Sequence, residues 1–227
     1  MSEGKAGIVG VLGGTGPQGS GLALRWAVAG LRVVIGSREA GRAEKLAREL
    51  GQRADLDADV DGLSGTDNAG CALRADIVMV TVPWEGHDAL LTSLREPLAG
   101  KIVIDCVNPL GFDERGPYPL QVAEGSAAQR AAALLPESRV IAAFHHVSAV
   151  LLADLSVTQV DCDVLILGDD RAAVDQVRAL ADAIPGVRGV YGGRLRNAGQ
   201  VEALTANLIA VNRRYRTHAG IRVTGLP

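Results

Sequence analysis

Three glycines near the start of the chain have the spacing of a phosphate-binding turn. The pattern Gly14-x-Gly16-x-x-Gly19 follows an apolar run, AGIVGVL, and precedes a run of small and apolar residues typical of a helix. Glycines let backbone N–H groups approach a pyrophosphate closely, and the N-terminus of a helix attracts negative charge. Between a strand and a helix the pattern therefore predicts a dinucleotide site, with the hydroxyl of Thr15 beside the phosphates. The plainer interpretation is a tight turn that binds nothing.

The end of the second apolar run, LRVVIG, indicates which dinucleotide fits. Proteins that bind NAD place an acidic residue there to accept hydrogen bonds from the ribose 2′-hydroxyl. Here Ser37 and Arg38 come first, and Arg42 lies one helical turn further on. A hydroxyl and two guanidinium groups suit the 2′-phosphate of NADP. We therefore predict NADP(H), with Glu39 as the alternative ribose ligand and a solvated helix start as the plainer alternative.

The sequence has no motif for a nucleophile or a metal. It contains neither GxSxG nor HExxH, and its three cysteines have no metal-ligand or disulfide spacing. A redox dinucleotide carries its own reactivity, so the protein needs only to position the reacting groups. We expect no essential catalytic residue and no metal, with His145 as an orienting residue and His87 reaching the nicotinamide. The alternative for each histidine is a purely structural role.

Short apolar runs alternate with helical patterns along most of the chain. The expected strands are 6–12, 31–36, 76–82, 101–105, 139–143, 163–167 and 187–191. The expected helices are 20–29, 39–50, 67–74, 84–96, 122–135, 171–184 and 196–220. Strands that are apolar throughout and alternate with helices predict a parallel sheet covered on both faces. The predicted fold class is α/β, a Rossmann-like doubly wound and mostly parallel sheet with a small helical C-terminal segment.

Two parts of unequal size follow from this pattern. Residues 1–193 are expected to form the NADP-binding domain, and residues 194–227 a helical segment that closes the site, forms a dimer interface, or does both. The second part is too short to fold alone. Residues 106–119 are expected to form a loop, and Thr66 is the expected N-cap of the helix that follows it.

Composition argues against several other classes of protein. The 23 basic and 26 acidic residues are interspersed, which leaves a formal net charge of −3 and no basic stripe for nucleic acid. Aromatic residues make up 3% of the chain, too few for a base-stacking platform. Neither a membrane-spanning apolar run nor a signal-peptide pattern is present. We therefore expect a cytoplasmic protein that binds neither nucleic acid nor membranes.

Several longer stretches resemble one known family. They are GGTGPQGSGLALRWA, VVIGSRE, VTVPWEGH, AAFHH, DVLILGDD and VEALTANLIAVN. Together they are similar to NADPH-dependent coenzyme F420 reductases, also called F420H2:NADP oxidoreductases, over essentially the whole chain. The resemblance implies hydride transfer between C4 of the nicotinamide of NADP(H) and C5 of the deazaflavin of coenzyme F420, its co-substrate.

The resemblance also implies which residues hold the two coenzymes. Val82 and Pro83 would lie against the nicotinamide, and His145, Val147 and Ser148 near the deazaflavin. The full set expected to bind coenzymes is Gly14, Thr15, Gly16, Pro17, Gln18, Gly19, Ser37, Arg38, Arg42, Val82, Pro83, His87, Asn108, His145, Val147, Ser148, Ala149 and Asn197.

This chain departs from the family pattern at two places. Relatives carry proline where Ser148 stands, and Asn-x-Arg where this chain has Asn197-Ala198-Gly199. Both departures fall on the deazaflavin side, so the expected NADP contacts match the family more closely than the expected deazaflavin contacts.

Two other functions stay open at this point. An imine or pyrroline-carboxylate reductase would need a longer helical C-terminal region, and a β-hydroxyacid dehydrogenase would need a late lysine, whereas no lysine follows Lys101. A non-enzymatic NADP sensor would keep the glycine-rich turn without a second pocket. Whichever applies, apolar residues of the last helix, such as Leu204 and Leu208, predict a homodimer interface.

Overall fold

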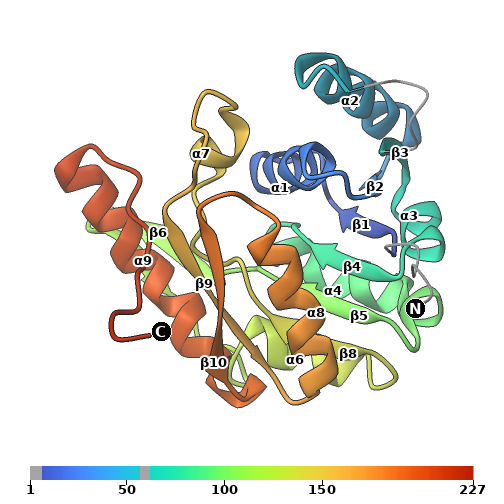
Figure 1. The fold of residues 1–227 in the computed structure, drawn as a ribbon. Helices are drawn as coiled ribbons and strands as arrows, with labels where there is room; N and C mark the ends of the chain where they lie inside the picture. The colour runs from blue at the N-terminus through green and yellow to red at the C-terminus, as the bar shows by residue number, and fades with distance from the viewer. Residues whose placement is uncertain (1–6, 57–61, 227) are drawn as a thin grey trace.

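An eight-stranded sheet runs through the molecule in the order β10-β9-β8-β5-β4-β1-β2-β3 (Figure 1). Its strands are β1 (Val9–Leu12), β2 (Val33–Ser37), β3 (Leu63–Asp67), β4 (Ile77–Val80), β5 (Ile102–Asp105), β8 (Arg139–Ala142), β9 (Cys162–Gly168) and β10 (Val187–Gly193). All neighbouring strands are parallel except β8 and β9, which confirms the predicted fold class. The computed structural model describes residues 7–56 and 62–226; Ala6, where the first strand was expected to begin, lies outside them.

Helices cover both faces of this sheet. Alternate residues of a strand point to opposite faces, so Ile102 and Ile104 pack into one apolar core and Val103 into the other. The first face carries α1 (Pro17–Val28), α2 (Ala40–Arg53), α7 (Ala149–Ala153) and α8 (Arg171–Asp182). The second carries α3 (Asn68–Arg74), α4 (Trp84–Ser93), α5 (Arg95–Leu98), α6 (Ala127–Leu134) and α9 (Ala198–Tyr215). Within the described ranges, no helix has both the length and the apolar character needed to cross a bilayer.

The sheet has a topological switch point at β1. The chain adds β2 and β3 on one side of β1 and then returns to place β4 on the other side. In open α/β sheets a crevice forms at such a point, outside the carboxyl ends of the strands. The glycine-rich turn after β1 and the segment Thr81–Pro83 after β4 both reach this crevice, so the fold brings them together.

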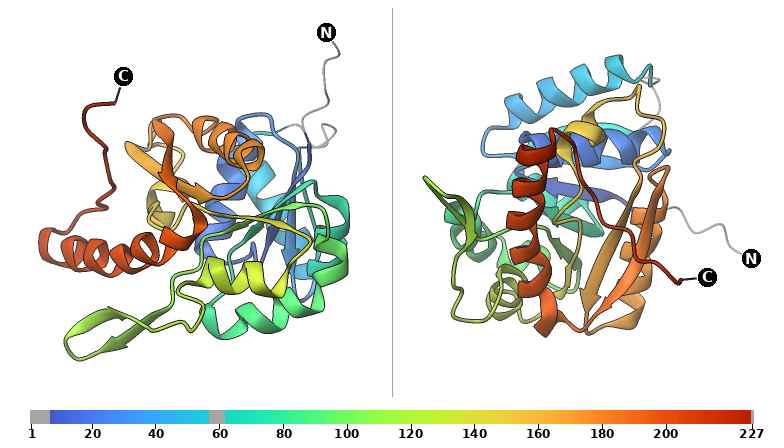
Figure 2. Two further views of the ribbon diagram at one scale, coloured as in Figure 1. Left: turned by 90° about the horizontal axis from the view of Figure 1, so that it is seen from below. Right: turned by 90° about the vertical axis from the view of Figure 1, so that its left-hand side faces the viewer.

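The segment 106–119 contains a hairpin, where a loop was expected. Strands β6 (Leu110–Asp113) and β7 (Gly116–Pro119) pair in antiparallel fashion and project from the body beside α9 (Figure 2). The Asp113 carboxylate accepts two backbone N–H bonds in the turn, and Gly116 has a φ of +119°. The prediction was wrong because the strands are short and rich in glycine and proline, so no alternating pattern marks them.

The region around β3 also differs from the prediction. Strand β3, LSGTD, was not predicted because it is a polar and partly exposed edge strand. The residue that caps α3 is Asp67, whose carboxylate accepts a hydrogen bond from the N–H of Gly70 at 2.6 Å. Thr66, the expected cap, is the next-to-last residue of β3 instead.

Two helices are shorter than the sequence pattern indicated. Helix α6 begins only after Ser126, its N-cap, because Gly125 just before it has a φ of +101°. Helix α9 ends at Arg216, which adopts the left-handed conformation with a φ of +53°. Beyond Arg216 the chain leaves the helix and returns to the sheet.

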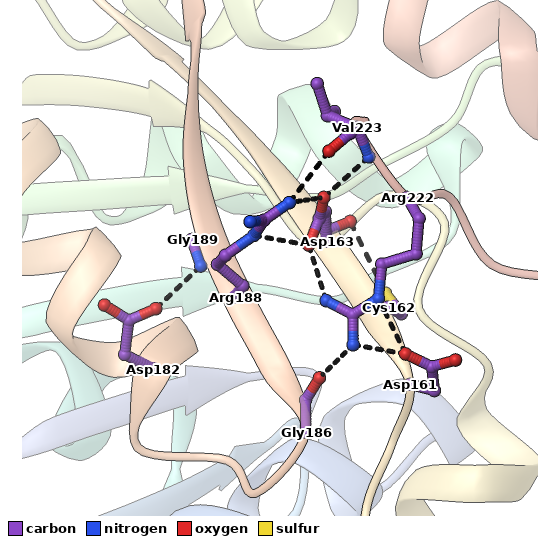
Figure 3. Close-up of polar contacts among 9 residues, drawn as sticks. All are labelled: Asp161, Cys162, Asp163, Asp182, Gly186, Arg188, Gly189, Arg222 and Val223. Atoms are coloured by element: carbon purple, nitrogen blue, oxygen red, sulfur yellow. Dashed lines mark hydrogen bonds and ion pairs between the residues drawn. The ribbon is translucent and has the colours of Figure 1, made fainter. Parts of the chain in front are cut away.

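The returning C-terminal segment is held by a buried carboxylate, Asp163 in β9 (Figure 3). Asp163 is fully buried and accepts hydrogen bonds from Arg188 at 2.7 and 3.0 Å, from Arg222 at 2.6 Å, and from the N–H of Val223 at 2.7 Å. Arg222 also pairs with Asp161. The bonds from Arg188, followed by those from Val223 and Arg222, hold the pKa of Asp163 well below its ordinary value.

We expect Asp163→Asn to lower the free energy of unfolding by about 2–3 kcal/mol, because two guanidinium groups lose their carboxylate. Since folding depresses the pKa of Asp163, its contribution is fully present above the ordinary pKa of 3.8 and is lost as pH falls towards the folded value. Urea unfolding measures this. The difference in the free energy of unfolding between wild type and variant should be smaller at about pH 2 than at about pH 7. Equal stability at neutral pH would contradict this role.

Candidate functional site

A cavity of about 690 Å³, called the outer cavity below, opens at the switch point. Its walls come from the glycine-rich turn, the end of β2, the start of α2 and the segment after β4. The expected residues that line it are Thr15, Gly16, Pro17, Gln18, Ser37, Arg38, Arg42, Val82 and Pro83. The fold thus gathers the expected NADP residues around one space.

The three glycines of the turn have different roles. A Cβ on Gly14 would lie 2.7 Å from the carbonyl oxygen of Val11, and one on Gly19 would lie 2.5 Å from Oγ1 of Thr81. The fold itself therefore excludes a side chain at both positions. A Cβ on Gly16 would meet only the carbonyl oxygen of Gly13, at 3.7 Å. Since Gly16 lines the outer cavity, its missing side chain leaves room for a ligand.

The start of α1 gives this turn an attraction for anions. Gly16 is the N-cap of α1 and Pro17 its first residue, and the first turn has no acidic side chain. The first N–H groups of a helix have no partner within the helix, and the helix dipole favours negative charge there. These properties suit a pyrophosphate.

The cations at the end of β2 are available for a further phosphate. Ser37 is buried at the strand end, and Arg38 and Arg42 are exposed side chains on the wall of the outer cavity. Neither arginine has an ion-pair partner among the described residues. Glu39, the alternative ribose ligand, does not line the cavity. This arrangement fits NADP better than NAD.

A smaller space of about 240 Å³, called the inner cavity, adjoins the outer one. The two share four wall residues, which are Gln18, Thr81, Val82 and Pro83. The rest of the inner wall is made by Trp84 at the start of α4, by residues 106–108 after β5, and by His145. A ring bound at the shared wall would therefore face the inner cavity.

His145 presents a neutral imidazole to the inner cavity. It is 5% exposed, and neither ring nitrogen has a hydrogen-bond partner in the described part of the chain. Burial lowers its pKa to about 4, so at neutral pH one nitrogen donates and the other accepts. Buried polar atoms without partners are rare, and the ring nitrogens of the adjacent His146, which lines neither cavity, also lack partners among the described residues.

The backbone around His145 is fixed from several sides. Phe144 adopts a φ of +65°, uncommon for a bulky residue, and its ring packs edge-on against Trp26 at 5.6 Å. The side-chain amide of Gln18 donates to the carbonyl oxygen of Phe144 at 3.3 Å. The Asn108 amide donates to the carbonyl oxygen of His145 at 2.9 Å. Gln18 therefore links the glycine-rich turn directly to the His145 segment.

Besides Gly14 and Gly19 of the turn, five expected contacts line neither cavity. His87 is fully buried and bonded to a carboxylate beneath the inner cavity. Val147 packs in the apolar core, Ser148 is the N-cap of α7 and Ala149 its first residue. Asn197 is the N-cap of α9. These five residues therefore stay predicted contacts that do not line either cavity.

Other residues of the site were not predicted. Asn68 lines the outer cavity and accepts a hydrogen bond from the N–H of Gly13 at 3.2 Å. Thr205 on α9 donates towards Oδ1 of Asn108 at 3.3 Å and the carbonyl oxygen of His145 at 3.4 Å. The available signal for Thr205 was a polar residue on the largely apolar helix segment VEALTANLIAV.

One turn before Thr205, the carboxylate of Glu202 anchors α9 to α6. Glu202 is 3% exposed and accepts hydrogen bonds from the backbone N–H groups of Ala127 at 2.9 Å and Ala128 at 3.2 Å. Burial raises the pKa of Glu202 to about 7, and the two backbone hydrogen bonds only partly oppose this rise. The residue therefore titrates near neutral pH in the folded protein.

We expect Glu202→Gln to remove a pH dependence of stability. Because folding raises the pKa of Glu202 from 4.5 to about 7, the folded state binds this proton more tightly than the unfolded state. As pH falls from about 7 towards 4.5, the free energy of unfolding of wild type should rise relative to that of the variant, by up to about 1.4 kcal/mol per pH unit. Urea unfolding of both proteins between about pH 8 and about pH 5 measures the difference. A difference that stays constant over that range would refute the assignment.

Comparisons with known proteins match this description. A family model described as "NADP oxidoreductase coenzyme F420-dependent" matches residues 8–109, which contain every residue that lines the outer cavity. The F420-dependent NADP reductase of Methanothermobacter thermautotrophicus is 43% identical over 224 residues, 96% of this chain and 95% of that protein. A solved structure of a putative F420-dependent NADP reductase from Arthrobacter sp. FB24 has a TM-score of 0.78 at 25% identity, covering 96% of this chain and 98% of that chain.

A more distant structure shows the fold alone. An imine reductase from Myxococcus stipitatus has a TM-score of 0.63 at 19% identity, covering 93% of this chain and 62% of that chain. The relative from Methanothermobacter, by contrast, matches over nearly the full length of both proteins. The family predicted from the sequence is thereby confirmed, and this chain belongs to the F420-dependent NADP reductases.

Proposed function

We propose that the protein transfers a hydride between NADPH and oxidised coenzyme F420. The observation that carries the proposal is the pair of adjoining cavities, which share the wall formed by Gln18, Thr81, Val82 and Pro83. One cavity has the groups that suit NADP, and the other has an unpartnered imidazole for a second ring. Two rings bound one in each cavity would meet where the cavities adjoin.

The NADP end of the reaction depends on binding groups. The N–H groups of the turn and of the start of α1 hold the pyrophosphate, and Ser37, Arg38 and Arg42 hold the 2′-phosphate. Val82 and Pro83 form an apolar wall behind the nicotinamide. Each of these interactions fixes the reduced ring without taking part in bond breaking, which is what positioning catalysis requires.

The deazaflavin end depends on polar groups and exclusion of water. A hydride leaves C4 of the reduced nicotinamide and bonds to C5 of the deazaflavin, which also takes up one proton from water. The neutral ring of His145 both donates and accepts, so it orients the deazaflavin without needing to change its charge. Asn108 and Thr205 hold the His145 backbone in place. No residue of the chain forms a covalent bond to either coenzyme.

Mixing the protein with NADPH and purified coenzyme F420 tests the proposal. The visible absorbance of the oxidised deazaflavin should disappear together with the near-ultraviolet absorbance of NADPH, one molecule for one. No loss of either absorbance, with both coenzymes bound, would overturn the proposal. His145→Ala should keep measurable turnover, because His145 orients the ring and supplies no essential proton.

The two other candidate functions have less support. The match covers 62% of the imine reductase structure at 19% identity, whereas it covers 95% of the F420-dependent relative at 43% identity. A sensor of NADP would have no use for the inner cavity or for a buried histidine without partners. Reduction of a cyclic imine by NADPH, with no reaction of coenzyme F420, would favour the first of these alternatives.

We also propose that the protein acts as a cytoplasmic homodimer. Val211 and Tyr215 on α9 are exposed, as are Phe112 and Tyr118 on the adjacent hairpin. Exposed aromatic and apolar side chains that gather on neighbouring elements are typical of a protein–protein interface. Light scattering after gel filtration at micromolar concentration tests the dimer, and a monomer would refute it.

A further inference from the structure

A buried histidine–aspartate pair contacts two residues that line the inner cavity. Nε2 of His87 is 2.6 Å from Oδ2 of Asp105, and both side chains are fully buried. Neither residue lines the inner or the outer cavity. Burying two charges costs several kcal/mol before their attraction is counted, so a well-packed apolar pair would serve stability at least as well. The pair therefore calls for a reason other than stability.

The surroundings of His87 favour the charged form of its ring but prevent the ring from acting on a substrate. Burial opposes the charged ring, yet the hydrogen bond and negative charge of Asp105, reinforced by Asp88 at 3.4 Å, raise the pKa of His87. Arg130 in turn binds Asp88 at 2.7 Å. Both ring nitrogens of His87 thus face carboxylates, which leaves no nitrogen free to exchange a proton with a bound ring.

The pair joins two separate segments of the inner wall. His87 lies one turn into α4, and its ring lies against that of Trp84, with centroids 5.3 Å apart. Asp105 ends β5, and its second oxygen accepts a hydrogen bond from the N–H of Val107 at 2.9 Å. Trp84 and Val107 both line the inner cavity, and each is the direct neighbour of one partner.

Two further titratable groups lie close to the pair. His145 interacts electrostatically with Asp105. Glu202 of α9 interacts with both Asp105 and His87, and it reaches α6 through backbone N–H groups. Thr205, one turn later on the same helix, bonds to Asn108 and the carbonyl oxygen of His145. Helix α9 is therefore connected to the His87–Asp105 pair, to α6 and to the wall at Asn108 and His145.

We propose that His87 and Asp105 are positioning residues for hydride transfer. Their hydrogen bond fixes the position of Trp84 relative to Val107, on the wall of the inner cavity. The proposal rests on the proposed function and adds to it a reason for the buried charges. Hydride transfer is sensitive to the distance between the two carbons, and a misplacement of about 1 Å can cost about 100-fold in rate. The pair acts through its neighbours and does not touch either ring.

Single-turnover hydride transfer in Asp105→Asn, with both coenzymes saturating, tests the proposal. We expect the rate to fall about 10- to 100-fold while the dissociation constant for NADPH stays within about twofold. With transfer slowed, the primary isotope effect from NADPH deuterated at C4 should rise. The double variant with His87→Gln should be no slower than Asp105→Asn alone, because both changes remove one interaction.

Asp163→Asn is the matched control, since it also replaces a fully buried carboxylate. Asp163 lines neither cavity and belongs to the C-terminal clasp, which is the cluster of Asp163 with Arg188, Arg222 and Val223. This variant should lose stability and keep the wild-type transfer rate when fully folded. An unchanged rate in folded Asp105→Asn, or an equal loss in Asp163→Asn, would overturn the proposal. If Asp105→Asn does not fold, His87→Gln alone replaces it, because glutamine keeps a hydrogen-bond donor towards Asp105. The same slower transfer at unchanged NADPH affinity is then expected, and an unchanged rate would overturn the proposal. Absence of transfer in wild type would instead refute the proposed function.

Discussion

Gly16→Val should leave a folded protein that no longer binds NADPH. A Cβ at this position would meet only the carbonyl oxygen of Gly13, at 3.7 Å, and the N-cap conformation, with φ of −78° and ψ of 165°, suits any residue. The free energy of unfolding should change by no more than about 1 kcal/mol. The branched side chain, however, occupies the space where a pyrophosphate must approach the backbone. We expect the dissociation constant for NADPH, measured by its fluorescence on titration, to rise at least about 100-fold.

Gly19→Ala serves as the contrasting control within the same turn. Its Cβ would lie 2.5 Å from Oγ1 of Thr81 and 2.6 Å from Cα of Gly14, and a backbone atom cannot move aside cheaply. We expect a loss of about 3 kcal/mol in the free energy of unfolding, together with weaker binding. Should both variants lose stability equally, Gly16 would have a structural role and the site assignment would fail.

Arg38→Ala should remove most of the preference for NADPH over NADH. A charge-assisted hydrogen bond to a phosphate contributes about 1.5–3 kcal/mol, which is about 10- to 100-fold in affinity. The KM for NADPH should rise by this factor, whereas the KM for NADH should hardly change because NADH has no 2′-phosphate. Adding Arg42→Ala should raise the KM for NADPH further, since both guanidinium groups face the same cavity.

Lys45→Ala is the matched control for this experiment. Lys45 is also a cation of α2, but it is exposed to solvent, pairs with Glu49 and does not line the outer cavity. Its removal should leave the KM for both dinucleotides unchanged. A comparable rise for NADPH in Lys45→Ala would mean that general positive charge, and not a defined phosphate site, attracts the coenzyme.

The sheet was predictable because its central strands carry their own signal. Runs such as DIVMVTV and KIVID are buried on both faces, so they are apolar throughout and their helices separate them clearly. The edge strand β3 and the hairpin β6–β7 are exposed and polar or rich in glycine and proline. Their pairing is decided by neighbours and turns, which no short window of sequence reveals.

The two cavities also differ in how far the sequence predicts them. The outer cavity comes from contiguous motifs, GGTGPQG and GSRE, in which backbone conformation and local spacing determine the geometry. The inner cavity is assembled from segments far apart in the chain, and Thr205 contacts Asn108 across 97 positions. Neighbours of His145 in sequence, such as Val147 and Ser148, were therefore a poor guide to its neighbours in space.

The C-terminal clasp has a consequence for the order in which the protein is made. Every residue that lines the outer cavity has been joined to the chain once Leu90 has been added. Thr205 and Glu202 are added only with α9, and Arg222 and Val223, which bind Asp163, follow α9 in the chain. Because chains fold from the N-terminus during synthesis, a nascent or prematurely terminated chain has the groups for one coenzyme long before those for the other.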